Sequence, residues 1–127
     1  MDYSVIDTEK APAAIGPYSQ GMKAGEVVYT SGQLPINMET GVMESDIEEA
    51  TKASILNCES ILEKAGSDLS RVVKTQIFLR DMDDFAAMNQ VYAEYFKAPY
   101  PARSCVQVAK LPKDAVVEIE MVGLAQK

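Results

Sequence analysis

The sequence predicts a single α+β domain in which one β-sheet carries two helices on one face. The chain has 127 residues, of which 47% are hydrophobic and 24% charged, as expected for one ordinary globular domain spanning residues 1–127. Segments with strand and helix patterns follow one another in the order strand, strand, helix, strand, helix, strand, strand. Two amphipathic helices are enough to cover only one face of such a sheet.

The first two strands form a predicted hairpin. Residues 11–20 hold two prolines and a glycine, which favour an extended loop. A strand at 19–24 and a second strand at 27–31 follow, joined by a turn at 24–26. Residues 35–43 contain a turn signal and predict a loop.

The first predicted helix begins at Ser45 or Asp46, because Ser45 and Glu48 have the spacing of a capping box. It ends at Gly66, which takes the position after the C-cap. One stripe at helical spacing is predicted to be buried, and it consists of Ile47, Ala50, Ser54, Cys58, Ile61, Leu62 and Ala65.

An apolar segment at 71–79 predicts an interior strand. A second cap signature at 81–84 then opens a helix to about Phe96. Its aromatic stripe is interpreted as core, with Asn89 beside it as the exception. Pro99 and Pro101 end this helix.

The last two predicted strands cover residues 103–109 and 115–123, and a turn at 111–114 joins them. Both segments alternate between polar and apolar residues, so each strand presents one polar face. If the two strands are neighbours in the sheet, their polar faces coincide.

The candidate site is this shared polar face. Arg103, Cys105 and Gln107 lie on one face of the first strand, because side chains alternate along a strand. Glu118 and Glu120 share one face of the second strand. The expected arrangement is an arginine that faces two carboxylates, on a sheet face that no helix remains to cover. We therefore expect another subunit to cover it, with the site at the subunit boundary.

The absence of histidine narrows the chemistry more than any other feature of the composition. It excludes Ser-His-Asp and Cys-His nucleophilic pairs, zinc held by histidine and imidazole acid-base catalysis. The sequence also lacks the glycine-rich motifs that bind nucleotide phosphates. Carboxylates, hydroxyls, arginine, lysine and backbone groups remain.

Charge, hydropathy and cysteine content indicate which partners and which cellular location to expect. With 12 basic and 19 acidic residues, the net charge is −7, which argues against nucleic acid as a partner. No segment has the pattern of a membrane span or a signal peptide, so the cytoplasm is the expected location. Cys58 and Cys105 are expected to be reduced.

Several motifs follow one another along nearly the whole chain. They are Ile-Gly-Pro-Tyr-Ser-Gln-Gly at 15–21, Thr-Ser-Gly-Gln-Leu-Pro at 30–35, Asn57, Val-Lys-Thr at 73–75, residues 85–89, and Pro-Ala-Arg-Ser-Cys-Val at 101–106. Together they resemble the RidA family of reactive intermediate deaminases, also called the YjgF family.

The resemblance implies a chorismate-mutase-like α+β fold with a mixed sheet. It also implies a homotrimer with the sheets inside, the helices outside and active sites in clefts between subunits. The implied reaction, without cofactor or metal, converts reactive 2-imino acids to 2-keto acids and ammonia, as in a 2-iminobutanoate/2-iminopropanoate deaminase. The imines would come from enamines such as 2-aminoacrylate or 2-aminocrotonate, and the implied role is metabolite damage control.

Site residues follow from the resemblance by motif. Arg103 would bind the substrate carboxylate, and Glu118 would orient or activate water. The cleft would be lined by Tyr18, Ser31, Gly32, Asn89 and Cys105, the last through its backbone. Between Phe96 and Pro101 the chain is a few residues shorter than expected for the family, which affects the rim of the cleft.

Other interpretations stay open. Spacing alone also fits Arg103 and Glu118 as an interface ion pair, and it does not separate Glu118 from Glu120 as the base. A module that binds a keto or amino acid without turnover is the main alternative function. An RNA-acting protein is the weaker one, because no basic stripe interleaved with aromatic residues is present.

Overall fold

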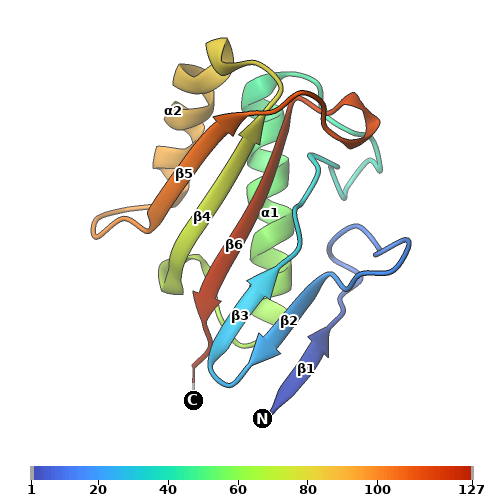
Figure 1. The fold of residues 1–127 in the computed structure, drawn as a ribbon, viewed down its shortest axis with the longest axis vertical. Coiled ribbons are helices and arrows are strands. Elements are labelled where there is room, and N and C mark those ends of the chain that lie inside the picture. The colour runs from blue at the N-terminus through green and yellow to red at the C-terminus, as the bar shows by residue number, and fades with distance from the viewer. Residues whose placement is uncertain (1, 127) are drawn as a thin grey trace.

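One mixed sheet carries both helices on the same side in the computed structural model, which describes residues 2–126 (Figure 1). The strands are β1 (Tyr3–Ile6), β2 (Gly21–Ala24), β3 (Val27–Thr30), β4 (Val72–Leu79), β5 (Ala102–Gln107) and β6 (Val117–Leu124). The helices are α1 (Ile47–Lys64) and α2 (Phe85–Tyr95), and short 3₁₀ turns lie at Leu69–Arg71, Met82–Asp84 and Pro112–Asp114. The predicted α+β class is confirmed.

The strand order across the sheet is β1-β2-β3-β6-β4-β5. The pair β4 and β5 is parallel, and every other neighbouring pair is antiparallel. A parallel pair needs a long crossover, and α2 supplies it between β4 and β5. Both helices pack on the same face of the sheet, where they share one core (Figure 1).

The predicted hairpin is present as β2 and β3, with Gly25 at a φ of 60° in its turn. Strand β1 was not predicted. It pairs with β2 at the edge of the sheet, and three of its four residues are exposed. An edge strand with so little burial does not show the alternation by which strands are found in a sequence.

Helix α1 begins and ends close to the predicted residues. The Asp46 carboxylate accepts a hydrogen bond of 3.1 Å from the Glu49 backbone N–H, so Asp46 is the N-cap. Gly66 follows the C-cap with a φ of 86°, as the sequence predicts. The predicted stripe packs on the sheet, and from Ala50 onward all of its residues are buried.

The core lies between the sheet and the two helices. Its fully buried large side chains come from α1, α2, β4 and β6, and they include Ile55, Ile61, Leu62, Ile77, Leu79, Met88, Ile119 and Met121. The central strands are thus held by apolar packing on their helix side. No described helix combines the length and the apolar character that a membrane span requires.

The expectation that the last two strands are neighbours is wrong. Strand β4 lies between β5 and β6 and pairs with both. The apolar β4 takes this central place because its alternate residues, among them Thr75, Ile77 and Leu79, are fully buried against the helices. The connection between β5 and β6 therefore crosses over the end of β4 (Figure 1).

The predicted shared polar face is wrong for the same reason. Arg103 is the register partner of Thr75, which faces the helices, so Arg103 also lies on the helix side of the sheet. Glu118 is the partner of Phe78, and Glu120 is the partner of Gln76, on the opposite side. Within one chain the arginine does not face the two carboxylates.

The side of the sheet that carries Glu118 and Glu120 is not covered by a helix in residues 2–126 (Figure 1). Apolar side chains share it with the carboxylates, and Tyr29 is 49% exposed there and Val106 43%. We call this surface the open face.

Candidate functional site

The predicted site residues fall into two groups, and the first of these surrounds Glu118. A cleft of about 740 Å³ is lined by segments of the 12–18 loop, the chain after β3, the turn before β6 and Glu118 itself. We call it the Glu118 cleft. It brings together four of the residues named from the family resemblance, Tyr18, Ser31, Gly32 and Glu118. Lys113 also lines it and was not predicted, because it lies in a segment interpreted only as a turn.

The chain beside Glu118 is fixed by backbone hydrogen bonds. The Gln33 N–H donates to the Ile119 carbonyl at 2.8 Å, and the Ile119 N–H donates back to the Gln33 carbonyl at 3.2 Å. The Ser31 hydroxyl donates to the Ser19 carbonyl at 2.6 Å. This hydroxyl therefore joins the two segments that border the cleft.

Gly32 lies directly against the Glu118 side chain. A Cβ atom at position 32 would stand 2.5 Å from the Glu118 Oε2 atom and 2.7 Å from its carboxyl carbon. Real Cβ atoms essentially never lie so close to another heavy atom. Glycine is therefore required for Glu118 to keep this position in the cleft.

The environment of Glu118 favours the protonated form of its carboxyl group more than water does. Burial raises the pKa of Glu118, and the negative charge of Glu120 on the same strand raises it further. A carboxylate with a raised pKa is a stronger base once ionised. The geometry thus distinguishes Glu118, which lines the cleft, from Glu120.

The second group surrounds Arg103. A pocket of about 430 Å³ is lined by Asn89, Tyr92, Ala93, Tyr100, Pro101 and Arg103. We call it the Arg103 pocket. It lies where α2, the 96–101 segment and β5 meet, and it is separate from the Glu118 cleft on the same chain.

The guanidinium of Arg103 is held by helix α2. Its Nη1 donates a hydrogen bond of 2.6 Å to the Asn89 side-chain oxygen. The guanidinium carbon lies 4.7 Å from the ring centroid of Tyr92 and 5.6 Å from that of Phe85. Among residues 2–126, no carboxylate forms an ion pair with Arg103. Its remaining N–H groups are thus available for an anionic ligand.

Cys105 lies on the same strand face as Arg103. Burial raises the pKa of its thiol, and the nearby Arg103 charge lowers it to a smaller extent, so the thiol is not activated. The Val108 N–H donates to the Leu79 carbonyl at 3.0 Å. Because backbone groups alternate in direction along a strand, the Cys105 N–H points away from β4, to the free edge of the sheet.

Tyr92 and Phe85 contact the predicted site although the sequence interpretation assigned their stripe to the core. Tyr92 is buried and packs in the core as predicted, but one ring face also meets Arg103. The sequence did contain a signal: Phe85, Asn89 and Tyr92 are spaced by four and three residues, so they share the helix face that carries Asn89.

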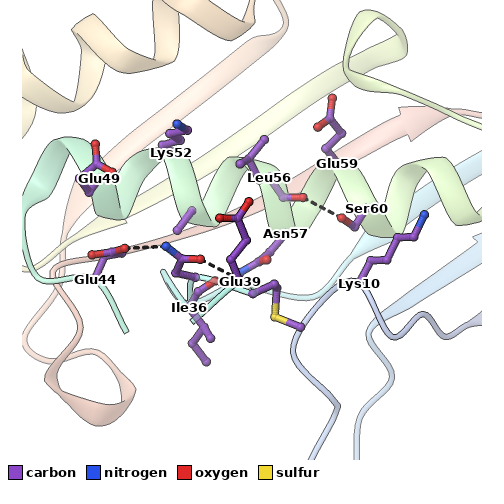
Figure 2. A pocket seen from close by; sticks show the side chains of 13 residues that line it. Lys10, Ile36, Glu39, Glu44, Glu49, Lys52, Leu56, Asn57, Glu59 and Ser60 are labelled. Carbon is purple, nitrogen blue, oxygen red and sulfur yellow. Dashed lines mark hydrogen bonds between the residues drawn. The ribbon is translucent and has the colours of Figure 1, made fainter. Parts of the chain in front are cut away.

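A third cavity, of about 320 Å³, lies between α1 and the 36–44 loop and contains none of the predicted site residues (Figure 2). Asn57 lines it, and its side-chain amide donates to the Leu34 carbonyl at 3.2 Å and the Ile36 carbonyl at 2.9 Å. This motif residue thus anchors the chain that leads from the Glu118 cleft. Among the described residues, no three Asp, Glu or Cys side chains are grouped to hold a metal ion.

A family model described as endoribonuclease L-PSP matches residues 8–125. The chain belongs to this family. The endoribonuclease L-PSP family is the one whose motifs the sequence resembles, because its relatives carry the names RutC family and reactive intermediate deaminase. The predicted relationship is confirmed.

Two curated relatives and one solved structure illustrate the similarity. A RutC family protein of Pyrococcus abyssi is 50% identical over 97% of this chain and 98% of its own. The 2-iminobutanoate/2-iminopropanoate deaminase of Escherichia coli is 46% identical over 94% of this chain and 95% of its own. The crystal structure of Escherichia coli TdcF with bound serine has a TM-score of 0.91 and 42% identity, and the match covers 97% of this chain and 99% of that one. Members of the endoribonuclease L-PSP family thus include named deaminases.

Proposed function

We propose that this protein is a cofactor-independent deaminase that hydrolyses 2-imino acids to 2-keto acids and ammonia. The observation that carries the proposal is the pair of half-sites: one has a carboxylate that lines a cleft, and the other has an arginine that pairs with no carboxylate among residues 2–126. The Escherichia coli relative named 2-iminobutanoate/2-iminopropanoate deaminase supports the substrate class. The proposed location is the cytoplasm.

Arg103 binds the substrate carboxylate. A guanidinium presents two parallel N–H donors that match the two oxygens of a carboxylate, which an ammonium group does not. Asn89 and the Tyr92 ring hold the guanidinium at one side, so its other N–H groups are directed to the ligand. The Cys105 backbone N–H, at the free edge of β5, is a further donor for this end of the substrate.

Glu118 activates the water. The carboxylate takes a proton as the water oxygen bonds to the imine carbon and delivers it to the nitrogen, which gives a carbinolamine. It then takes the proton of the new hydroxyl as the C=O bond forms and delivers it to the nitrogen as the C–N bond breaks, so ammonia leaves with both protons of the water. The products are a 2-keto acid and ammonia, and no electrons are gained or lost. Tyr18, Ser31 and Gly32 form the surrounding wall.

The two half-sites combine between subunits. Arg103 and Glu118 lie on opposite sides of the sheet within one chain, so a single site that uses both requires two copies. The open face, with its exposed apolar side chains, is suited to lie against another copy. We therefore propose the chorismate-mutase-like homotrimer, with the sheets inside and the helices outside. A chain that sedimented as a monomer while fully active would contradict this arrangement.

The substrates are small. Tyr100 and Pro101, from the short segment after α2, line the Arg103 pocket beside the proposed carboxylate position. The pocket volume of about 430 Å³ is large enough for the proposed substrates 2-iminopropanoate and 2-iminobutanoate.

A binding module is the second candidate. The related TdcF structure contains bound serine, an amino acid with a carboxylate that an Arg103-like group would hold. RNA cleavage, which the family description names, has less support, because the net charge is −7 and the chain has no histidine.

The test generates 2-aminoacrylate in place with a separate enzyme and measures keto-acid release with and without the protein. We expect acceleration that is lost in Arg103→Ala and kept in Arg71→Ala, since the Arg71 side chain donates to the Leu124 and Ala125 carbonyls, away from both half-sites. Tight keto-acid binding without acceleration would establish the binding module instead.

A further inference from the structure

The ring that the Arg103 guanidinium contacts, that of Tyr92, belongs to a buried pair of hydroxyl side chains. The side-chain oxygens of Thr75 and Tyr92 are 2.8 Å apart, and either hydroxyl can donate. Thr75 is fully buried, and Tyr92 is 5% exposed. Thr75 is the register partner of Arg103, so the pair joins β4, the strand next to that of Arg103, to helix α2.

The pair fixes the ring on which Arg103 rests. The Tyr92 ring also stacks on the Phe96 ring, and their centroids are 4.5 Å apart. The Thr75 hydroxyl holds the phenol end of Tyr92, and the guanidinium carbon lies 4.7 Å from the ring centroid. A ring held at its tip and by a stacked neighbour presents one fixed surface to the cation.

Packing alone does not require these hydroxyls. A valine and a phenylalanine would fill nearly the same volume without two polar groups to satisfy in the core, and buried polar groups cost stability unless they are hydrogen-bonded. Burial raises the pKa of Tyr92, so the phenol remains neutral and keeps its hydrogen bond at neutral pH. The bond therefore persists under conditions in which Arg103 binds an anion.

We infer that Thr75 and Tyr92 are positioning residues, which fix the orientation of the Arg103 guanidinium for the substrate carboxylate. The inference rests on the proposed function for its consequence in binding, but the effect on the guanidinium itself does not depend on any activity. Asn89 fixes one edge of the guanidinium by its hydrogen bond, and Tyr92 fixes its plane.

The test first observes the guanidinium directly, by the NMR signal of the Arg103 Nε–H group in the free protein. The sequence has three arginines, Arg71, Arg80 and Arg103, so the signals are assigned by replacing each with lysine. We expect the Arg103 signal to be displaced by the Tyr92 ring and to move toward the position of a free arginine in Thr75→Val. Thr75→Ser should restore it.

The second measurement is binding of pyruvate, a 2-keto acid of the product class. Thr75→Val is expected to weaken it about 2- to 10-fold, the effect of one lost buried hydrogen bond. Thr75→Val should add nothing in an Arg103→Ala background, because its effect acts through Arg103. The matched control is Thr51→Val, which removes another fully buried threonine hydroxyl, one that donates to the Ile47 carbonyl in α1. It should lower stability only.

The two measurements separate the inference from the proposed function. An unchanged Arg103 signal in folded Thr75→Val would overturn the inference, whatever the activity. A displaced signal without any pyruvate binding by the wild-type protein would support the positioning and contradict the proposed function. If Thr75→Val does not fold, Tyr92→Phe breaks the same bond from the helix side and is subject to the same two outcomes.

Discussion

Arg103 and Glu118 lie on opposite sides of one sheet, in strands that β4 separates. An active site that needs both residues must therefore draw Arg103 from one copy of the chain and Glu118 from another. This relationship leads to a complementation test of the proposed assembly.

Two inactive variants should restore activity when they assemble together. We expect Arg103→Ala and Glu118→Gln each to be inactive alone. After unfolding and joint refolding in equal amounts, about a quarter of the sites should combine two intact halves and give about a quarter of the wild-type activity. The measurement is imine hydrolysis before and after joint refolding. The control for the effect of joint refolding itself is a double variant, with both changes in one chain, that is refolded with the wild-type protein. Absence of any recovery would place both residues of a site in the same chain.

Replacement of Arg103 by lysine should impair binding despite the retained charge. The lysine ammonium group has no pair of parallel N–H donors. It also cannot reproduce the guanidinium hydrogen bond to Asn89 or the stacking on Tyr92. We expect the KM to rise about 10- to 150-fold, corresponding to about 1.5–3 kcal/mol for a charge-assisted interaction. Steady-state kinetics measure this, and a KM within twofold of wild type would show that only the charge matters.

Glu118 and Glu120 should differ in their effect on rate. Glu118→Gln is expected to lower kcat about 10²- to 10⁴-fold, the usual contribution of a general base. Glu120→Gln should leave most of the activity, because Glu120 does not line the cleft. A larger loss in Glu120→Gln than in Glu118→Gln would reverse this assignment.

The same pair predicts a shift in pH dependence. Activity requires the ionised form of Glu118, so it falls as the pH decreases through the raised pKa of that group. Removing the negative charge of Glu120 lowers the pKa of Glu118, since that charge is one of the causes that raise it. The acid limb of the kcat profile in Glu120→Gln should therefore move to lower pH. A movement to higher pH would contradict the prediction.

Gly32→Ala should reduce catalysis more than stability. The added methyl group would lie 2.5 Å from the Glu118 Oε2 atom, and the end of a glutamate side chain moves more easily than backbone. We expect a loss of kcat of about 10- to 100-fold from the displaced base, with the free energy of unfolding lowered by less than about 1 kcal/mol. Chemical denaturation and kinetics check the two effects. In a Glu118→Ala background, Gly32→Ala should cost no further activity.

The sequence was sufficient to predict elements whose signals are local. Helix α1 was found from the spacing of Ser45 and Glu48, the buried stripe and Gly66, all within one segment, although its N-cap is Asp46, which accepts from Glu49. The interior strand β4 was found from its apolar run. The grouping of Tyr18, Ser31, Gly32 and Glu118 came from the family resemblance, because these residues are far apart in sequence and no local pattern joins them.

What could not be predicted depends on pairing between distant strands. The shared polar face of Arg103 and the glutamates was inferred from the alternation of side chains within each strand. Alternation shows whether side chains on two strands lie on the same side of the sheet only if the two strands pair. The insertion of β4 between them placed the arginine and the glutamates on opposite sides. Strand β1 has too few buried residues to be recognised, and the contact of Tyr92 with Arg103 depends on the packing of α2 on the sheet.

Strand β4 sets the spacing of the two half-sites. Thr75 is beside Arg103 on one neighbour, and Phe78 is beside Glu118 on the other, so the offset between the two functional residues along the sheet is three residues of β4, about 10 Å. Deletion of one residue within β4 would shorten this offset and turn the side chains that follow to the other face of the sheet. Strand β4 carries neither Arg103 nor Glu118, but an insertion or deletion in it would displace both residues at once.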